Sequence, residues 1–536
     1  MNRFLTGFTL FSLIWGITFI GIAQQASEFN NIFFGDIQKS KNTVRSLQET
    51  KDGNILCVQS DNSFFRGLSK KNNDLTFDYI NDLSLPKSKP ANYYGDGKKS
   101  KFINYTFLGD QILGLSYKTT ALHRGPEFFY HIINPKFQEK SNHGFPVSIF
   151  DARFNTLDYS RFAMISKDDA SYAAAIYFPH SKANENSHIS YAIFKDDFSA
   201  PSQYNLIYPY PSRVFEPIDF NIIDKEMQLF FTGHYATTAR GNRIQLEQNF
   251  DFININHLDN NKLTTTTFQS PGLFFVDVKL YTEDDKMLLI GLYSSQATGI
   301  IEGTFSVNIN QEGEIENQVF TQFPPNVKFD LQEYEKSLAS SLRFSQVEYA
   351  KFNIIDAKMV DDGMVIVSEF KAVEYRYSGS DMPGSTSVVD TYYWRGDIMV
   401  SKTDTLGNLV WTTTFPKTQR TINDGGYFLS ASTYFSESNL HLFFNDNADN
   451  YNQEGNYILN YERPDFTKLG NLKNTIGHVD VDMSTGVSSR KTIIGRSESN
   501  VIFVPQLSVP LPEKNKMIIY GVNGNRHRIG YLTFLK

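Results

Sequence analysis

The residues of this sequence most suited to chemistry are its ten histidines, its single cysteine and its carboxylates. The histidines are scattered, and none forms the HxH or HExxH spacing that zinc sites use. Cys57 stands alone in the apolar stretch GNILCVQSD, which predicts a small core residue and allows no disulfide within the chain. The sequence also lacks a G-x-S-x-G elbow, a phosphate-binding loop and a G-x-G-x-x-G turn. We therefore predict no catalytic, metal-binding or cofactor-binding residues and no cofactor.

Two stretches resemble binding motifs only in part. The stretch NDNADNYNQEG, residues 445–455, has the composition of a calcium loop but not the D-x-[DN]-x-[DN]-G order that wraps the ion, so it predicts a solvated loop. The tripeptide RGD, residues 395–397, opens a predicted strand and favours a chance match over an adhesion signal. A carboxylate pair for glycoside hydrolysis would combine distant parts of the chain, so sequence spacing does not reveal it.

The composition indicates strands and excludes some partners. The chain has 46 Phe and 29 Tyr, and such aromatic content suits half-buried strands better than helices. Its formal charge is −7 and is spread along the chain, which argues against nucleic-acid binding and against a basic membrane-binding patch.

The first residues, MNRFLTGFTLFSLIWGITFIGIAQQ, predict a secretory signal peptide over residues 1–24. Arg3 supplies the positive start, and the small residues Gly21 and Ala23 stand at the positions before a cleavage site. The alternative is an uncleaved membrane anchor, because the apolar run is about long enough to span a bilayer. No second run approaches that length, so we expect no transmembrane segment after cleavage and one domain over residues 25–536.

A turn of Asp, Asn and Gly followed by an apolar strand occurs eight times, and such turns mark hairpins. The starts are spaced by 56 to 60 residues in the first part of the chain and by 76 or 77 later, and this regularity is the signature of a repeat fold. The predicted strands begin at Asn54, Gln111, Ser171, Met227, Lys286, Gly363, Leu440 and Lys516.

Each repeat carries four strand candidates, which predicts an all-β fold of the β-propeller type with four-stranded blades. We expect eight blades; seven blades and a row of separate β-sandwiches are the alternatives. The last repeat lacks a fourth strand, whereas residues 30–39 form a spare strand before the first repeat. Pairing the two would close the ring and cover an exposed edge.

One inserted helix is predicted near residues 329–345, where Leu331, Tyr334, Leu338 and Leu342 recur at roughly helical spacing. It either fills a gap between blades or docks a partner.

Two long connections, residues 371–396 and 446–477, are expected to lie side by side as loops on one face of the propeller. They are rich in Tyr, and exposed aromatics beside Arg are typical of protein interfaces. The alternative is that these rings pack the loops onto the body. The predicted partner-binding residues are Tyr375, Tyr377, Tyr392, Tyr393, Trp394, Tyr451, Tyr457 and Tyr461.

Residues 391–428 carry a longer pattern: a strand ending in DI-V, then D-x-x-G-x-x-x-W, a Lys/Gln segment and NDGGY. This passage is similar to one in uncharacterised exported β-propeller-like proteins of Bacteroidota, whose leaders also end in Ala-Gln. The resemblance implies a fold and a habitat but no catalytic residues. Because the C-terminus RIGYLTFLK does not resemble a type nine sorting domain, we expect the periplasm or the periplasmic face of the outer membrane.

These observations predict a non-catalytic exported propeller that binds a protein partner in the cell envelope, with an outer-membrane or type nine secretion complex as the expected setting. The alternative is a glycan-binding or glycan-cleaving propeller with its site over the central channel. Inward-facing acidic, His or Tyr side chains would favour the alternative, and a channel filled by Phe and Leu would favour the scaffold.

Overall fold

The computed structural model describes residues 29–534 apart from a set of internal stretches. The predicted signal peptide lies outside the described residues. The stretches left out are 41–42, 51–52, 61–74, 81–91, 96–97, 120–125, 135–140, 148–161, 168–169, 180, 182–184, 224–226, 241–242, 260–261, 284–285, 299–300, 342–346, 379–387 and 459–472.

Three sheets cover the first part of the chain, and each contains one of the predicted turn–strand pairs. We number the repeating units one to eight in chain order after these pairs. Unit one comprises β3 (Thr43–Glu49), β4 (Ile55–Ser60) and β5 (Leu75–Tyr79); unit two β6 (Asn92–Gly95), β7 (Lys98–Lys99), β8 (Lys101–Leu108), β9 (Gln111–Thr119), β10 (Pro126–Ile133) and β11 (Ser141–Val147); unit three β12 (Phe162–Ser166), β13 (Tyr172–Tyr177), β14 (Ser187–Lys195) and β15 (Ser202–Tyr208).

One 8-stranded sheet holds units four and five, whose strands are paired to each other at Phe250–Phe275. Within each unit the strands run antiparallel in chain order. Unit four comprises β16 (Phe215–Ile222), β17 (Met227–Arg240), β18 (Arg243–Asp259) and β19 (Lys262–Phe268), and unit five β20 (Phe274–Glu283), β21 (Lys286–Ser294), β22 (Gly303–Ile309) and β23 (Ile315–Gln322).

Three further sheets complete the chain. Unit six comprises β24 (Val347–Val360), β25 (Gly363–Ser378), β26 (Val388–Asp404), β27 (Leu409–Phe415) and β28 (Gln419–Ile422); unit seven β29 (Ala431–Phe435), β30 (Asn439–Asn447), β31 (Asn474–Asp482) and β32 (Ser488–Gly495); unit eight β33 (Ile502–Phe503), β34 (Val509–Leu511), β35 (Lys516–Asn523) and β36 (Arg526–Phe534), together with β1 (Phe29–Phe34) and β2 (Gln38–Lys39). The helices are α2 (Pro325–Ser341) and α3 (Arg496–Ser499), with 3₁₀ turns η5 (Ala448–Asn450), η6 (Pro505–Leu507) and η7 (Pro512–Lys514).

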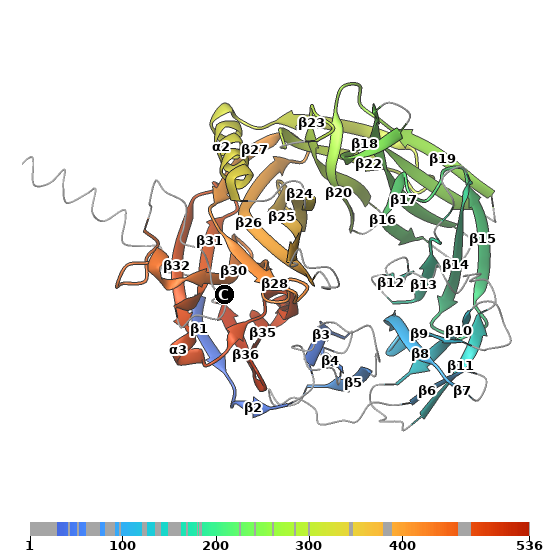
Figure 1. Cartoon of the computed structure of the whole chain (residues 1–536), viewed down its shortest axis with the longest axis horizontal. Coiled ribbons are helices and arrows are strands. Elements are labelled where there is room, and N and C mark those ends of the chain that lie inside the picture. Colours follow the sequence, from blue (N-terminus) through green and yellow to red (C-terminus); the bar gives the residue numbers. More distant parts are fainter. Residues whose placement is uncertain are drawn as a thin grey trace, which may run out of the picture.

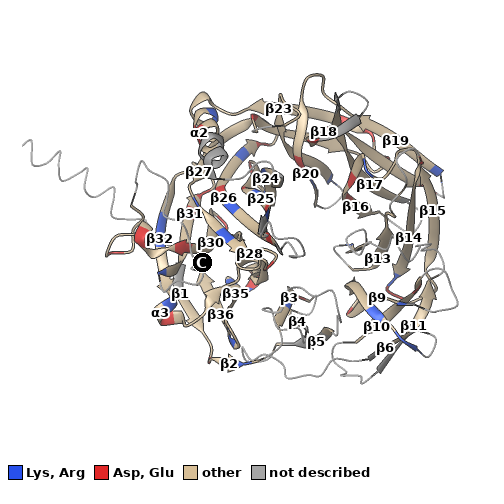
Figure 2. Ribbon diagram, in the orientation of Figure 1, with Lys and Arg blue, Asp and Glu red and all other residues tan. Residues whose placement is uncertain are grey.

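The sheets follow one another around a ring in chain order (Figure 1). The first strands of units three to six lie toward the centre of the ring, and the last strands of units three to five lie at its outside (Figure 1). Radial repetition of small antiparallel sheets is the arrangement of a β-propeller, so the predicted all-β fold is confirmed. Figure 2 shows charges of both signs spread around the ring.

The strands of all eight predicted turn–strand pairs are present, although residues 51–52, 168–169, 224–226 and 284–285 of the preceding turns lie outside the described residues. Each strand begins within one residue of its predicted start. The reason is local chemistry. In the turn between β26 and β27, Asp404 Oδ1 accepts the backbone N–H groups of Leu406 and Asn408, and Gly407 adopts a φ of +92°. Such Asp and Gly positions specify a turn without help from distant residues. Cys57 is buried in the core, as predicted.

A β-bulge interrupts the first strand of units two, four, five and six, and an Asn or Asp follows each bulge. These residues are Asn104, Asp219, Asp277 and Asp356, and each side chain accepts the N–H of the next residue. Bulges re-aim the side chains beside them, here toward the neighbouring unit.

The three carboxylates of this set each accept a second hydrogen bond, from a backbone N–H or a hydroxyl in the first strand of the next unit. We call this repeated contact the inner-strand clamp. Asp219 accepts the backbone N–H of Leu280, and Asp277 Oδ2 accepts that of Ile354 at 2.6 Å. Asp356 accepts the hydroxyl of Thr433. Burial raises the pKa of Asp219 and of Asp277. The clamps therefore connect units four, five, six and seven near the centre.

Helix α2 occurs where a helix was predicted, but it begins at Pro325 and ends at Ser341 rather than spanning residues 329–345. Leu331 and Tyr334 are buried with residues of units five and six, so the helix fills the gap between those units. The Tyr334 hydroxyl lies so close to Gly396 that a Cβ there would collide with it. The side chain of Leu338 and all of Leu342 lie outside the described residues.

The prediction that residues 371–396 form a loop is wrong. Strand β25 continues to Ser378 and β26 begins at Val388, and the two remain paired up to Ser378–Val388. Only residues 379–387 lie outside the description. The second predicted loop, residues 446–477, contains η5 and the start of β31, and its residues 459–472 are not described.

The two ends of the described chain meet in unit eight. Strand β1 pairs antiparallel with β36, from Phe29–Phe534 to Phe34–Gly530. The guanidinium of Arg528 donates to the carbonyls of Gly35 and Phe34 at 2.8 and 3.0 Å. The spare N-terminal strand thus lies beside the last strand, as the sequence predicts.

Buried histidines make stability depend on pH. His234, 2% exposed, lies among Tyr208, Thr232 and Asn254, and burial lowers its pKa to about 4 from an ordinary value of 6.5. Between pH 6.5 and 4 the unfolded chain binds a proton that the folded chain does not, so stability is lost as the pH falls through this range.

We expect His234→Gln to remove up to about 3 kcal/mol of the loss in unfolding free energy between pH 7 and pH 4. Urea unfolding at the two pH values measures it. The exposed His188 provides a matched control, His188→Gln. An equal loss in wild type and His234→Gln would show that this ring does not carry the dependence.

Candidate functional site

The predicted aromatic face lies on the long hairpin of β25 and β26, which β28 extends to three strands by pairing Tyr392–Ile422 through Arg395–Gln419. Tyr375, Tyr392 and Tyr393 are half-buried, whereas Trp394 is only 6% exposed. The side chain of Tyr377 is not described.

A buried carboxylate organises this hairpin. Glu374, 0% exposed, binds the guanidinium of Arg376 through both oxygens at 2.7 and 2.9 Å and accepts the Trp394 indole N–H at 3.2 Å. The Arg376 guanidinium in turn stacks 4.2 Å from the centre of the Tyr392 ring, and Arg420 lies 5.4 Å from the same ring. Arg–carboxylate forks and cation–π contacts fix side chains rigidly.

Beside this network Ile422 is 45% exposed. We call this surface the hairpin face, and it consists of Arg376, Tyr392, Arg420 and Ile422, which the strand registers place on one side of the sheet. Tyr375 and the 43% exposed Val389 alternate to the other side.

The second group of predicted aromatics packs onto unit seven. Asp446, 1% exposed, binds Arg490 and accepts the Tyr451 hydroxyl at 2.6 Å. Arg490 stacks on Tyr457 at 3.9 Å. Burial and the Asp446 carboxylate raise the pKa of Tyr451. Tyr451 is buried and Tyr457 half-buried, so these two rings hold their segment on the body, while Tyr461 lies outside the described residues.

The other stretches singled out from the sequence have internal partners. In the NDNADN stretch, Asp446 is buried in the contacts just described. In the RGD tripeptide, Arg395 is 8% exposed, and Asp397 Oδ1 accepts the backbone N–H of Lys417 at 3.0 Å.

A cavity of about 410 Å³ opens beside the innermost strands, and sequence analysis did not find it. We call it the central pocket. Its lining combines charged and amide groups from β20, β24, β25 and β26 with residues preceding β29 and in η6. The lining polar residues are Asp277, Lys279, Asn353, Glu369, Lys371, Arg395, Ser430 and Gln506.

Behind the pocket, Glu369 is saturated by partners. Its carboxylate is 1% exposed and binds Lys417 Nζ at 2.7 Å, the Ser430 hydroxyl at 2.7 Å and Arg395 Nε at 3.4 Å. Burial lowers the pKa of Lys417. Lys417 Nζ also donates to Gln419 Oε1 at 2.9 Å, and Gln419 Nε2 donates to the Asn445 carbonyl in β30 at 2.7 Å. This network connects unit six to unit seven. It gives a structural reason for the Lys and Gln residues in the passage over residues 391–428.

The NDGGY turn of the same passage reaches unit one. Asp424 accepts the Thr421 hydroxyl and the N–H of Gly426, and Gly426 has a φ of +75°. The Tyr427 hydroxyl then donates to the carbonyl of Val44 at 2.8 Å. The passage is therefore a structural connection between units.

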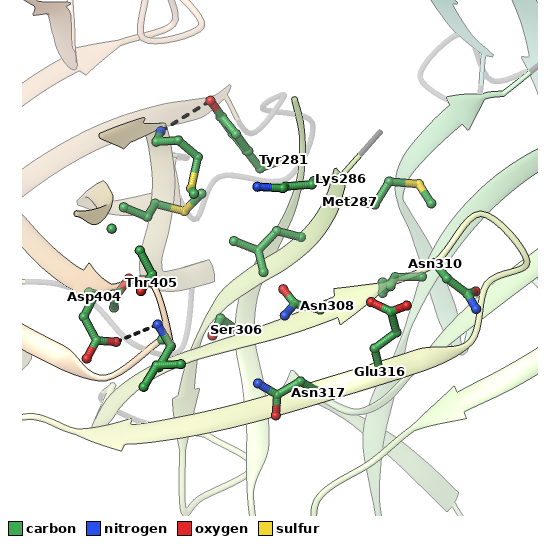
Figure 3. Close-up of a pocket in the computed structure, with 18 of the residues that line it drawn as sticks. Tyr281, Lys286, Met287, Ser306, Asn308, Asn310, Glu316, Asn317, Asp404 and Thr405 are labelled. Atoms are coloured by element: carbon green, nitrogen blue, oxygen red, sulfur yellow. Dashed lines mark hydrogen bonds between the residues drawn. The ribbon is translucent and has the colours of Figure 1, made fainter. Parts of the chain in front are cut away.

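A second cavity, of about 600 Å³, lies between units five and six (Figure 3). Its floor contains Leu288, Met359 and Met364. Asn308, Glu316 and Asn317 line the side formed by β22 and β23, and Asp404 and Thr405 lie across from them (Figure 3). Asp404 already caps its own turn, and the other polar residues of the lining combine amide groups with the charged Lys286, Glu312 and Glu316.

The described residues contain no cluster of three His, Cys, Asp or Glu side chains placed to hold a metal ion. Within the same part of the chain, no helix is long and apolar enough to cross a membrane.

Sequence comparisons do not place the chain in a family: no family model matches it, and no curated protein matches it. Its structure is similar to several β-rich proteins at low identity. The WD40 domain of SCAP from fission yeast is 9% identical, covering 95% of this chain and 97% of that one, with a TM-score of 0.36. The polysaccharide lyase Uly1 is 10% identical over 85% and 94%, with a TM-score of 0.34.

The β-propeller domain of Nup133 from Vanderwaltozyma polyspora is 9% identical, covering 80% of this chain and 100% of that one, with a TM-score of 0.31. Because these TM-scores are low, the fold assignment rests on the strand order of this chain and not on its similarity to these structures.

We expect Glu369→Gln to lower the unfolding free energy by about 3–5 kcal/mol, because it leaves the Lys417 ammonium buried without its counter-charge. The double variant Glu369→Leu with Lys417→Met should recover most of this loss. Urea unfolding measures both.

The exposed pair Asp449–Lys473 provides the control, since Asp449→Asn should cost at most about 1 kcal/mol. A Glu369→Gln variant as stable as Asp449→Asn would refute the structural role of the buried pair.

Proposed function

We propose that this chain is an exported, non-catalytic β-propeller that binds a protein partner at the bacterial envelope through the hairpin face. The proposal is carried by one observation: a rigid three-stranded surface that combines half-buried Tyr392, the two guanidinium groups of Arg376 and Arg420, and the exposed Ile422. Aromatic and arginine side chains on a fixed scaffold are enriched at interface centres. The bacterial setting, export and the periplasmic location rest on the sequence resemblance and the predicted leader.

We further propose that the ring has eight blades, closed by the N-terminal strand. Splitting the 8-stranded sheet at the pair Phe250–Phe275 gives eight units, whose described strands pair antiparallel except for the parallel pair of β6 and β11 in unit two. Unit eight then takes its outermost strand from β1, which is the closure that removes an exposed edge.

The alternative function, a glycan-binding or glycan-cleaving propeller, is supported by the central pocket. Its lining of Asp277, Glu369, Lys371 and Arg395 is charged rather than filled by Phe and Leu. The likeness to a polysaccharide lyase adds nothing to this alternative at its TM-score.

Removal of residues 1–39 tests the closure. We expect the truncated chain to unfold at a lower temperature and to associate, because β36 would present an unpaired edge and Arg528 would lose its carbonyl partners. Thermal unfolding and light scattering measure the two effects. The matched comparison removes only residues 1–24. Equal stability and a monomeric state in both would contradict the closure.

A pull-down of the tagged native protein from solubilised envelope, with mass spectrometry, tests the scaffold proposal. We expect Ile422→Asp to reduce the recovered partner at least about tenfold, because it replaces the exposed apolar side chain of the hairpin face by a charge that binding would have to desolvate. The control is Ile207→Asp, since Ile207 is a 64% exposed isoleucine on β15, away from the hairpin. Recovery of no partner by the wild type, or equal recovery by both variants, would refute the proposal.

A further inference from the structure

Two rows of side chains line the cavity between units five and six (Figure 3). The row on unit five crosses β20 to β23, and strand register places in it Tyr281, Leu288, Asn308 and Asn317. The row on unit six crosses β24 to β26 and consists of Met359, Met364 and Thr403. Directly paired residues project from the same side of an antiparallel sheet. Both rows are therefore apolar or aromatic on the two inner strands and polar on the strands outside them.

The inner part of the cavity has an apolar lining. Leu288 and Met359 are half-buried there beside the buried Met364, and the three belong to a small cluster with Ile290 and Ile366. Protein interiors pack apolar side chains about as densely as organic crystals, so a cavity of about 600 Å³ beside such a cluster departs from ordinary packing. An apolar side chain that enters gains contacts with these groups, and methionine adapts its shape to varied neighbours.

One wall of the cavity presents an exposed leucine on a fixed turn. Leu406, 66% exposed, lies in the turn between β26 and β27. Asp404 caps this turn, and the hydroxyl of Thr321 in unit five donates to the Gly407 carbonyl at 3.4 Å. A Cβ at Gly407 would collide with the Ser306 side chain, so the turn packs closely against β22. Contacts from both units thus hold Leu406 at the cavity, where an entering apolar group would remove it from water.

The outer part of the cavity is polar and acidic. Asn308 and Asn317 are exposed, and each amide offers donors and an acceptor, as a peptide group does. The charged residues of the lining are one cation and three carboxylates, a net charge of −2: Lys286, Glu312, Glu316 and Asp404. Glu312 and Glu316 are exposed, and neither forms an ion pair within the described residues. The field at this opening therefore attracts a positively charged group.

We propose that this cavity binds an extended segment of a partner protein in which basic residues flank a large apolar one. Successive side chains of an extended chain point to opposite sides, so the apolar side chain enters between Leu288 and Met359 while its basic neighbours lie at the rim beside the two glutamates. The exposed amides bind the peptide backbone. The volume is within the usual range for ligand sites. The cavity lies at the opposite end of β25 and β26 from the hairpin face, so this proposal does not depend on the function proposed above.

Methyl NMR of the purified chain with isotope-labelled methionine tests the proposal, because Met359 lines the cavity and Met483 is buried elsewhere as a reference. The probe is the capped peptide Gly-Lys-Leu-Lys-Gly. We expect a saturable shift of the Met359 signal, identified by its loss in Met359→Leu, and none of the Met483 signal. The capped peptides Gly-Lys-Ser-Lys-Gly and Gly-Glu-Leu-Glu-Gly should bind at least about fivefold more weakly, since the first lacks the apolar side chain and the second reverses the charge. No shift with the probe, or equal affinity for the three peptides, would overturn the proposal.

Variants locate the peptide. Leu406→Ser should weaken binding of the probe at least about fivefold, because it removes apolar contact. Its matched control is Val487→Ser, since Val487 is 56% exposed in the corresponding turn of unit seven. The double variant Glu312→Gln with Glu316→Gln should weaken binding about fivefold and remove most of its salt dependence, whereas Glu513→Gln, on an exposed residue of η7, should change neither. Unchanged binding in both Leu406→Ser and the double variant would place the peptide elsewhere and refute the proposal.

Two other occupants give different results. If octyl glucoside shifts the Met359 signal as strongly as the probe does, the cavity takes an acyl chain. If light scattering shows a dimer that Leu406→Ser abolishes and Val487→Ser does not, the cavity takes a second copy of this chain. Either result would overturn the assignment to a basic peptide.

Discussion

The arrangement of this protein depends on carboxylates buried at bulges in its innermost strands. A carboxylate taken out of water is tolerated only when hydrogen-bond donors replace its hydration. Asp219 and Asp277 each accept an N–H from their own strand and another from the first strand of the next unit. These bonds join neighbouring units where they approach the centre, so they fix the spacing of the strands that line it. An Asn at either position would turn an NH₂ group toward an N–H donor, which explains why the acid is needed.

Away from the centre, other contacts hold units five and six together. At one end α2 supplies Leu331 and Tyr334 to the apolar core between the units, and Gly396 leaves room for the Tyr334 ring. At the other end the units share a smaller cluster of buried residues, Ile290, Met364 and Ile366, and Met364 also lines the larger cavity. The charged network of Glu369 and Lys417 then carries the connection on to unit seven. Units five and six are thus joined by the apolar residues of α2 at one end and leave a cavity at the other, whereas units six and seven are joined by the Glu369–Lys417 ion pair.

The parts of the fold that the sequence predicts are those set by neighbouring residues. The described turns before the predicted strands have Gly109, Gly363 and Asn515 at a positive φ, which Gly and Asn adopt readily, and the eight strands begin within one residue of their predicted starts. The prediction of a loop over residues 371–396 overlooks a strand pattern, because Val373, Tyr375 and Tyr377 alternate with Glu374 and Arg376. This pattern places a carboxylate on a buried side of the sheet, where Arg376 and Trp394 satisfy Glu374. The clamps left a usable signal, an acid between apolar residues in IDFNI, VDVKL and IDAKM, ahead of each turn. The central pocket left none, because Asp277 and Gln506 meet only once the ring has formed.

Two hairpins extend beyond their neighbours, and their support differs. In unit four, β17 and β18 remain paired out to Arg240–Arg243, but β19 begins its pairing with β18 only at Ile253. The outer part of that hairpin is therefore two-stranded over the residues described, and isolated two-stranded ribbons are marginally stable. In unit six, β28 backs Tyr392 through Arg395 with a third strand, and Glu374 fixes Arg376 and Trp394 from within. Rigidity reduces the entropy lost on association, so a surface on β25, β26 and β28 binds at a lower cost than one on β17 and β18. This difference, more than the number of tyrosines, is the reason that we propose unit six as the binding surface.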